Sequence, residues 1–545
     1  MKLISFLLRF SPGIVALAVF AGLVTGVSNS AILALINVVL SGPESGAAAI
    51  LWSFVGLCAL MLVSRIVSEV LLLRLSQDAI YNLRQELARR ILAAPLRRLE
   101  EQGAHRLLMS LTSDVPGIAQ ALNTIAVLCI QVAIVVSILI YMAWLSPTLL
   151  LCVCGFMAVG IASYQLMTRS GMGELELVRE HWDQLYKHFT ALTEGIKELK
   201  LHGPRRRSFR TELLDPAAHT VRRHNVRGMS TLIIATCWGQ LLFFVLIGAL
   251  IFALPALQQV GRQELTGYTI TILYMITPLQ TILGLLPELG RANIAMQKVD
   301  KLGLSLSADA EPDPADDARP PTWRSLELIG VTHAYHRERE NSSFTLGPID
   351  LSFTPGELVF LIGGNGSGKT TLAKLLTGLY LPESGAIRLD GRDVDDENRE
   401  AYRQLFSVVF SDFFLFESLL GLPAAQLDGH IQDLLVQLQL QHKVQIKEGE
   451  LSTIDLSQGQ RKRLALLTAY LEDRQIYLFD EWAADQDPLF KEIFYYRLLP
   501  ELKRRGKTVV VISHDDRYYH VADRVIKLDY GKVETLQPVG DYQYT

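Results

Sequence analysis

A glycine-rich run, Gly363–Thr371, has the residue types and the spacing needed to bind the phosphate groups of a nucleotide. Its sequence, Gly-Gly-Asn-Gly-Ser-Gly-Lys-Thr-Thr, fills every fixed position of the phosphate-loop pattern G-x-x-x-x-G-K-[ST]. Lys369 would reach the β- and γ-phosphates, and the Thr370 hydroxyl would hold Mg²⁺. Backbone N–H groups would curl around the phosphate oxygens, and the residues expected to form this cradle are Gly363, Asn365, Gly366, Ser367, Gly368, Lys369, Thr370 and Thr371. The chain is therefore predicted to bind a nucleoside triphosphate.

The sequence on either side of the loop supports this prediction. A strand-like run, 358–362, precedes the loop, and a helix-like run, 372–376, follows it. This strand–loop–helix context is the one in which the pattern binds phosphate, and the start of the helix adds the positive end of its dipole. The alternative is a glycine-rich turn with a chance lysine, which does not require that context.

Two carboxylates and a histidine follow other apolar runs of the same region. Asp480 and Glu481 end the run 476–479, and His514 comes shortly after the run 509–512. Asp480 is placed to support Mg²⁺ through its water shell, and Glu481 is placed to polarise the attacking water. His514 is expected to contact the γ-phosphate, although a lone histidine is more often structural or solvent-facing.

The run Ser457–Gln460 begins a strongly helical segment between the phosphate loop and the carboxylates. A serine and a glycine at a helix N-terminus offer a second cradle for an anion. Taken alone, the same residues are an ordinary N-cap with its capping partner.

The composition of the chain indicates a membrane protein. Apolar residues make up 50% of its 545 residues, and the mean hydropathy is +0.25. The net charge is −4, so no overall basic field argues for nucleic acid, and no nucleic-acid partner is expected. The five cysteines lie inside apolar runs without metal-ligand or disulfide spacing, and we expect them to be buried. Runs long enough to cross a bilayer lie at about 14–40, 49–73, 122–145, 147–167, 230–254 and 266–287.

Basic residues are distributed unevenly between these six predicted spans. They concentrate in the segments 74–106 and 187–227, whereas the loops near 41–48, 146 and 255–265 hold almost none. Because positive charge stays on the cytoplasmic side, we predict that both termini and both long segments are cytoplasmic.

The two basic segments are helical in composition. Apolar periodicity continues through 78–94 and 174–201, which indicates membrane helices that extend into the cytoplasm. Such extensions could transmit motion to a docked domain. Breaks that would fold their far ends into short turns or cross helices are expected at Pro95, Gly103, Gly203-Pro204 and Pro216.

Charged and polar side chains inside the predicted spans suggest either pairing between helices or a polar cavity. Arg65 and Glu69 lie four residues apart on one helical face, so they could form an ion pair or line a translocation path. The candidates for a substrate cavity are Arg65, Glu69, Gln131, Gln165, Gln240, Thr277 and Gln280.

The chain divides into three parts by composition. An all-α membrane domain with six spans covers 1–304, an acidic, proline-rich linker covers 305–322, and an α/β phosphate-loop ATPase domain covers 323–545. Helices packed on a mostly parallel sheet are predicted for the last part, with strand-like runs at 325–334, 347–353, 358–362, 406–410, 475–479, 508–512 and 524–528.

This set of motifs behind six spans resembles the ATP-binding cassette (ABC) exporter family over essentially the whole chain. The resemblance implies ATP and Mg²⁺ as cofactors, ATP hydrolysis coupled to transport, and a partner that is a second copy of the chain. Each ATP would be shared between the phosphate loop of one copy and the signature motif of the other. By this resemblance Tyr335 stacks on adenine. The catalytic residues would be Glu481, His514 and Lys369, and the signature and D-loop residues would be Ser457, Gly459, Gln460 and Asp487.

Two positions depart from the family pattern. Gln458 replaces a glycine of the signature motif, which is a tolerated variation. Ser411 stands where a glutamine usually touches Mg²⁺ and the nucleophilic water. We therefore expect Ser411 beside Thr370 and Asp480 at the metal, although its shorter side chain would need help from Asp412 or a water.

Three stretches narrow the resemblance to one branch of the family. FSVVFSDFFLF, LIGGNGSGKTTL and FDEWAADQDPLF…SHDDRYY look like cyclic-peptide and siderophore-peptide exporters, the group that includes exporters of pyoverdine precursors, syringomycin-type lipopeptides and lasso peptides. The stretch with Trp482 is a rare form of its motif, and the pyoverdine type is nearest. The resemblance implies export of a peptide or lipopeptide, such as a siderophore precursor or a cyclic peptide, across the bacterial inner membrane. The alternatives are a lipid or multidrug flippase exporter and a membrane-anchored regulatory ATPase.

Overall fold

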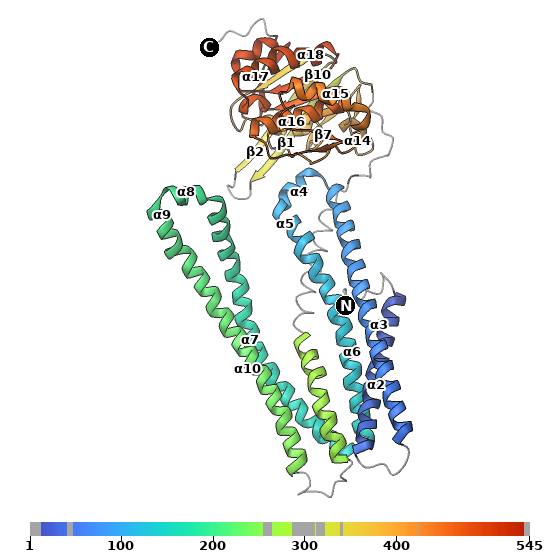
Figure 1. Ribbon diagram of the computed structural model, residues 1–545. Helices are drawn as coiled ribbons and strands as arrows, with labels where there is room; N and C mark the ends of the chain where they lie inside the picture. Colours follow the sequence, from blue (N-terminus) through green and yellow to red (C-terminus); the bar gives the residue numbers. More distant parts are fainter. Residues whose placement is uncertain are drawn as a thin grey trace. The chain divides into compact units, whose positions relative to one another are not determined.

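The chain forms two compact units, and Figure 1 shows their elements. A computed structural model describes residues 12–40, 47–253, 264–285, 311, 322–337, 342–422 and 424–538. The first unit falls within Met1–Leu87 and Leu107–Leu302, and the second falls within Ala88–Arg106 and Gly303–Thr545. The second unit therefore includes a short piece of chain that lies, in sequence, between two of the predicted spans.

The first unit is helical, and six of its helices are long and apolar enough to cross a membrane. This confirms the six predicted spans, apart from residues 254 and 286–287 at the ends of two runs, which lie outside the described residues. The candidate spans are Val19–Leu40, Ala48–Leu92, Arg106–Leu145, Pro147–Glu194, Gly203–Phe252 and Glu264–Leu285. The first two spans lie within α2 (Pro12–Leu40) and α3 (Ala47–Leu92), and the next three contain α6 (Val115–Leu145), α7 (Pro147–Glu194) and α10 (Asp215–Gly248).

The helices α3 and α7 run well past the length that a bilayer requires, as their apolar periodicity predicts. They have 46 and 48 residues, and at about 1.5 Å per residue α7 is about 72 Å long. The hydrocarbon core of a bilayer is only about 30 Å thick. Much of each helix therefore lies outside the hydrocarbon core.

Short helices follow the long ones close to the predicted breaks. Pro95 and Gly103 flank α4 (Leu96–Gln102), and Gly203-Pro204 begins α9 (Gly203–Ser208), just after α8 (Ile196–Leu201). The break expected at Pro216 is wrong. Helical structure continues there from the π-helix η2 (Phe209–Leu214) into α10, where the proline occupies the first turn. A proline is tolerated in a first turn, and a π-helical turn shifts the hydrogen-bond ladder that it would otherwise break.

The prediction that the cysteines are buried is also wrong for most of them. Cys129, Cys152, Cys154 and Cys237 are exposed on the helices of the first unit, and Cys58 is half-buried. These helices are candidate spans, whose outer surfaces meet hydrocarbon, and a small apolar side chain is as compatible with lipid as with a protein core.

The helices α7 and α10 pack along each other, and the contact depends on two glycines (Figure 1). A Cβ atom on Gly171 would lie 3.1 Å from the carbonyl oxygen of Gly228, and a Cβ atom on Gly228 would lie 2.9 Å from the side chain of Leu175. Small residues at such a crossing allow two helix backbones to approach closely. Gly173, two residues along α7, has nothing within 4 Å of its Cβ position.

The second unit has the predicted α/β architecture. A six-stranded sheet has the order β12-β11-β3-β10-β9-β6, in which β12 is antiparallel and the other strands are parallel. A four-stranded antiparallel sheet has the order β2-β1-β4-β5. The strands are β1 (Leu326–Arg337), β2 (Ser342–Phe353), β3 (Leu358–Ile362), β4 (Ser384–Leu389), β5 (Arg392–Asp393), β6 (Phe406–Val409), β9 (Ile476–Asp480), β10 (Thr508–Ile512), β11 (Arg524–Asp529) and β12 (Lys532–Pro538). Every strand-like run of the sequence therefore overlaps a strand. The strands β4, β5 and β12 and the short pair β7 (Ile446–Lys447) and β8 (Glu450–Leu451) were not predicted.

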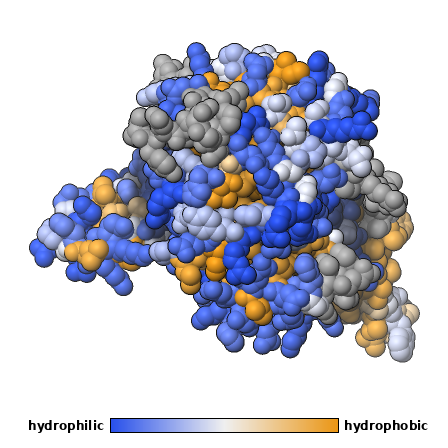
Figure 2. Space-filling model, turned by 90° about the horizontal axis from the view of Figure 1, so that it is seen from above, coloured by the Kyte–Doolittle hydropathy of each residue, from blue (hydrophilic) through white to orange (hydrophobic). Residues whose placement is uncertain are grey.

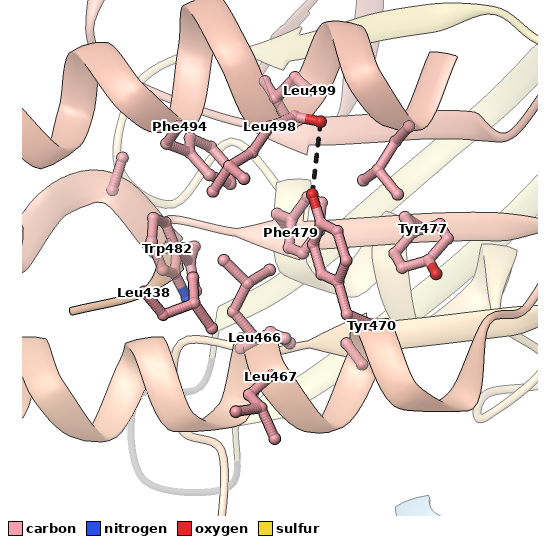
Figure 3. Close-up of a cluster of buried hydrophobic side chains, with 14 of the residues drawn as sticks. Leu438, Leu466, Leu467, Tyr470, Tyr477, Phe479, Trp482, Phe494, Leu498 and Leu499 are labelled. Carbon is pink, nitrogen blue, oxygen red and sulfur yellow. Dashed lines mark hydrogen bonds between the residues drawn. The ribbon is translucent and has the colours of Figure 1, made fainter. Parts of the chain in front are cut away.

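The parallel strands are buried on both faces. Along β3, Phe360 belongs to one hydrophobic cluster and Val359 and Leu361 belong to another. The first cluster holds the aromatic side chains around Trp482 and Phe494 in Figure 3, where the Tyr470 hydroxyl also donates to the carbonyl of Leu498. Continuous apolar strands are typical of a parallel sheet covered on both sides. The face of the molecule that Figure 2 shows is mainly hydrophilic, with scattered hydrophobic side chains.

The helices of the second unit connect these strands. The first of them, α13 (Lys369–Leu376), follows β3 directly after the glycine-rich loop, and α16 precedes β9. The helices after α13 are α14 (Arg399–Arg403), α15 (Ala424–Gln437), α16 (Gln458–Glu472), α17 (Pro488–Ile493) and α18 (Leu499–Arg504), with η4 (Trp482–Asp485), η5 (Phe494–Leu498) and η6 (Asp516–Val521) between or beside them.

We predict that Gly171→Val lowers the thermal stability of the protein because the added methyl groups would meet the backbone of α10. Overpacking of this kind typically costs about 1–3 kcal/mol. Gly173→Val, with an open Cβ position on the same helix, should leave the melting temperature close to wild type. Thermal unfolding of both variants in lipid nanodiscs checks this, and equal melting temperatures would contradict the close crossing.

Candidate active site

The carboxyl ends of four neighbouring parallel strands bring the predicted residues to one edge of the sheet. The glycine-rich loop follows β3, and Ser513 and His514 follow β10. Asp480 ends β9 and Glu481 comes directly after it, while Ser411 comes shortly after β6. These strands are consecutive in the sheet order β3-β10-β9-β6. Ligands of open α/β sheets bind at this edge, so residues up to 151 positions apart in sequence share one site because of strand order.

The loop after β3 adopts a conformation that requires glycine. Gly366 and Gly368 have φ values of 79° and 98°, in the left-handed region that other residues avoid. At Gly363, where φ is 149°, a Cβ atom would lie 2.1 Å from the carbonyl oxygen of Leu528. Any side chain there would collide with the neighbouring strand β11. The glycines therefore let the loop close into a cradle at the start of α13.

Lys369 folds back over this loop. Its Nζ atom donates to the carbonyl oxygens of Gly363 and Gly364 at 2.9 Å each, and its side chain is buried. Burial lowers the pKa of the ammonium group, and the charges of Glu481 and Asp480 oppose that shift. The cation is thus held at the opening of the cradle, where phosphate oxygens would be its natural partners.

Asp480 lies beneath the cradle and is almost completely buried. Its Oδ2 atom accepts hydrogen bonds from Thr370 Oγ1 at 3.1 Å and from Ser411 Oγ at 3.4 Å. Its Oδ1 atom is buried and has no hydrogen-bond partner among the described residues. Burial raises the pKa of this carboxyl group, and the nearby Glu481 adds to the shift. Two hydroxyls and an unpaired carboxylate oxygen form a hard-oxygen donor set that fits Mg²⁺.

Glu481 and His514 face each other beside this cluster. The Nε2 atom of His514 lies 3.0 Å from Oε1 of Glu481, and both side chains are about 40% exposed, at 42% and 38%. Glu481 has a φ of 50°, and its backbone N–H donates to the carbonyl of Ile512 at 3.1 Å. The turn that this bond holds directs the carboxylate of Glu481 away from the sheet, toward the open edge.

A cavity of about 610 Å³ opens over the loop. It brings together many of the predicted residues, namely Asn365, Gly366, Gly368, Lys369, Thr370, Thr371 and Glu481. It is also lined by three residues that were not predicted, Phe344, Lys374 and Tyr380. The predicted strand began at residue 347, so Phe344 fell outside it, although it lies on β2 directly opposite Tyr335. The side chain of Tyr335 lies outside the described part of the chain, so its expected stacking on adenine stays a prediction.

Ser457 and its neighbours are arranged as a helix cap. Ser457 Oγ accepts from the backbone N–H of Gln460, and Gln460 Oε1 accepts from the backbone N–H of Ser457, which completes a capping box at the start of α16. Asp487 caps α17 in turn, and the bond from the Phe490 N–H lowers the pKa of its carboxyl group. Among the described residues that line the cavity over the loop, none comes from the start of α16.

The short helix α4 belongs to the second unit and is bonded close to the cradle. Glu100 accepts from Lys374 Nζ at 2.7 Å and from the hydroxyl of Tyr380. Arg97 donates to Glu383 at 2.8 Å, a bond that lowers the pKa of that carboxyl group. Two of these partners, Lys374 and Tyr380, also line the cavity. The cross helix expected near 95–103 is therefore in direct contact with the walls of the nucleotide cavity.

The polar residues predicted inside the spans do not form one group. Arg65 and Glu69 pair with each other at 2.9 Å on an exposed face of α3. Gln280 instead lines a cavity of about 150 Å³ between α7, α10 and the span Glu264–Leu285, together with Tyr164, Thr236 and apolar side chains. Its Nε2 atom is buried and makes no hydrogen bond within the described part of the chain. Among the described residues that line this cavity, neither Gln131 nor Gln240 is present.

We predict that Asp480→Asn stabilises the nucleotide-free protein at neutral pH, by about 1 kcal/mol, while abolishing Mg²⁺-dependent ATP hydrolysis. The pKa of Asp480 is raised in the folded state, so its contribution to stability is complete below the ordinary carboxyl pKa and is lost as the pH rises through the raised value. The gain should therefore shrink in acid. Melting temperatures of the full chain across pH test this, with Asp433→Asn, at an exposed carboxylate of α15, as control; a lower melting temperature for Asp480→Asn at pH 7 would sink the argument.

Comparisons with known proteins agree with this geometry. The family described as "ABC transporter transmembrane region" matches residues 13–283, and the family described as "ABC transporter" matches residues 346–484. The ATP-binding protein SyrD of Pseudomonas syringae pv. syringae is 38% identical over 528 residues, which cover 95% of this chain and 93% of that protein. ATP-dependent lipid A-core flippases of Alkalilimnicola ehrlichii and Dechloromonas aromatica are 28% and 27% identical, covering 90% and 84% of this chain and 85% and 79% of those proteins. The chain therefore belongs to the ABC transporter family as a multi-pass membrane exporter that binds ATP and couples its hydrolysis to transport.

Proposed function

We propose that this protein exports a peptide or lipopeptide from the cytoplasm to the periplasm across the bacterial inner membrane. The observation that carries the proposal is the likeness to SyrD over nearly the whole of both chains, at clearly higher identity than the flippases. A siderophore precursor such as a pyoverdine precursor, or a cyclic peptide, is the narrower form of the proposal. Basic residues in 74–106 and 187–227 support an orientation with both termini and the ATPase domain in the cytoplasm.

The working unit in this proposal is a homodimer with two shared ATP sites. Ser457 and Gln458 are exposed at the start of α16, and that helix start does not contribute to the cavity over the phosphate loop of its own chain. A helix N-terminus with free space in front of it suits an anion that arrives with another molecule. A second copy, related by a two-fold axis, would present each α16 to the ATP of its partner. The division into 1–304, 305–322 and 323–545 gives each copy one membrane domain and one ATPase domain.

Each group of the site has a defined part in hydrolysis. Lys369 would bind the β- and γ-phosphates, and backbone N–H groups of the loop would hold the remaining oxygens. Thr370, Asp480 and Ser411 would hold Mg²⁺, which when bound offsets the charge of the phosphates. Glu481 would accept the proton of the attacking water, while His514, at 3.0 Å, orients that carboxylate and can reach the γ-phosphate.

Export requires that ATP binding and cargo binding act on the same conformational change. ATP binding would close the dimer, and the contacts of α4 at Glu100 and Arg97 would transmit that closure to the long helix α3. The membrane domain would then switch from an inward to an outward opening, and hydrolysis would reset it. A net direction follows only if the cargo binds the two openings with different affinity.

The first alternative is a lipid or multidrug flippase, and it is favoured by the lipid A-core flippases among the relatives. The cavity around Gln280 is compatible with either cargo because its lining is mainly apolar with a few polar groups. A lipopeptide would place its acyl chain against the apolar lining and a carbonyl oxygen against the unpaired Gln280 amide. The second alternative, a membrane-anchored regulatory ATPase, has no use for such a cavity.

Glu481→Gln is expected to reduce ATP hydrolysis by about 10²–10⁴-fold, the usual contribution of a general base. ATP binding should survive, so the variant should accumulate as a closed dimer. Hydrolysis by the purified protein in nanodiscs, together with ATP-dependent crosslinking of the two chains, measures both effects. Glu492→Gln, an exposed carboxylate of α17, serves as control. Wild-type hydrolysis by Glu481→Gln would rule out the assigned base.

Gly160→Leu should abolish the stimulation of ATP hydrolysis by an N-acylated peptide because its side chain would enter the cavity that contains Gln280. A Cβ atom on Gly160 meets only Leu242, at 3.4 Å, whereas one on Gly155 of the same helix meets nothing within 4 Å. Gly155→Leu is therefore the matched control and should retain stimulation. The same peptide without its acyl chain, and a phospholipid alone, distinguish lipopeptide from lipid cargo. Equal stimulation of both variants would show that this cavity does not hold the cargo.

A further inference from the structure

The segment after the catalytic glutamate is bonded to the start of α16 by three of its side chains. Trp482 Nε1 donates to the carbonyl of Lys462 at 2.7 Å, and Gln486 Nε2 donates to the carbonyl of Gly459 at 3.0 Å. Asp485 Oδ2 accepts from Gln458 Nε2 at 3.1 Å. The unusual residues Gln458 and Trp482 thus both take part in the same contact. No step of hydrolysis described above uses these bonds.

Lys462 completes this contact with a buried charge. Its side chain is only 4% exposed, and Nζ lies 2.7 Å from Oδ2 of Asp485. The same Nζ atom donates to the backbone carbonyl of Glu481 at 2.9 Å. A buried ammonium group is costly unless each of its bonds is made. The path Gln458–Asp485–Lys462–Glu481 is therefore continuous from the first residue of α16 to the main chain of the catalytic residue.

We propose that Lys462 and Asp485 are positioning residues that couple the start of α16 to Glu481, so that ATP bound at one shared site of the dimer sets the catalytic carboxylate of the other. This rests on the proposed function, in which α16 faces the ATP of the partner chain while Glu481 serves the ATP of its own chain. One chain then joins the two sites through the side chains of Gln458, Asp485 and Lys462 and the backbone carbonyl of Glu481.

The local geometry makes this connection stiff. The peptide groups on both sides of Glu481 are held, its N–H by Ile512 of β10 and its carbonyl by Lys462 of α16. A Cβ atom on Gly459 would lie 3.0 Å from the carbonyl oxygen of Asp485, so the helix start and the loop touch with little free space.

The ring of Trp482 anchors the loop in the core. It stacks on Phe494 with centroids 4.4 Å apart, and Figure 3 shows it within the buried cluster. If the start of α16 moves, the turn at Glu481 should therefore move with it, because the segment that joins them has little freedom to deform.

The test uses Lys462→Met and Asp485→Asn in the full chain, with basal ATP hydrolysis as readout. Each should lower kcat by about tenfold, because the groups act on the orientation of Glu481, while the KM for ATP changes little. The Hill coefficient for ATP is expected to exceed one in the wild type and to fall to one in these variants. The double variant should be no worse than either single variant because both interrupt one path. Asp433→Asn, an exposed carboxylate of α15, is the control that should behave as wild type.

Gln458→Ala keeps the test decisive if Lys462→Met or Asp485→Asn fails to fold. This substitution is at an exposed position and removes only the bond from Gln458 to Asp485. It should lower the Hill coefficient with a smaller loss of kcat. A wild-type kcat in both Lys462→Met and Asp485→Asn, or a loss confined to thermal stability, overturns the positioning role. A lowered kcat with an unchanged Hill coefficient, or a Hill coefficient of one in the wild type, overturns the coupling between sites. Failure of Glu481→Gln to form an ATP-locked dimer contradicts the proposed function instead, and it is measured separately.

Discussion

The parallel pairing of β3, β10, β9 and β6 is the constraint on which the active site depends. Because these strands run in one direction, their carboxyl ends meet at one edge, and each end contributes one chemical group. Burial on both faces prevents any strand from slipping in register without moving its whole apolar set. The positions of Lys369, Asp480 and His514 are thus determined by the packing of the core beneath them.

That arrangement holds two opposite charges in a poorly hydrated place. Burial lowers the pKa of Lys369 and raises the pKa of Asp480. The charged form of each group is therefore less stable here than it would be in water. Each would gain most from a ligand of the opposite charge, phosphate for the lysine and Mg²⁺ for the aspartate. Part of the affinity of the site for phosphate and Mg²⁺ therefore comes from relieving unfavourable electrostatic free energy that is present in the free protein.

The sequence predicts an element well where consecutive residues carry its signal, either as a motif or as a run of apolar side chains. Gly363–Thr371 could be recognised because glycine is required by the backbone, and β3 and β10 because each holds at least four apolar residues in a row. Phe344, Lys374 and Tyr380 could not, since they reach the cavity from the antiparallel sheet, from α13 and from the segment after α13, and their side chains carry no pattern. The bonds of Lys462 were equally hidden, because a lysine within a helix is normally solvated.

The close glycine crossing of α7 and α10 has a mechanical consequence. Two long helices whose backbones touch at Gly171 and Gly228 resist sliding and bending at that point, so they move as one stiff rod. A rod of about 72 Å that tilts by about 5° displaces its far end by about 6 Å, roughly one helical turn. A small rotation of this helix pair near the short helices α8 and α9 would thus move its other end by about the width of a side chain.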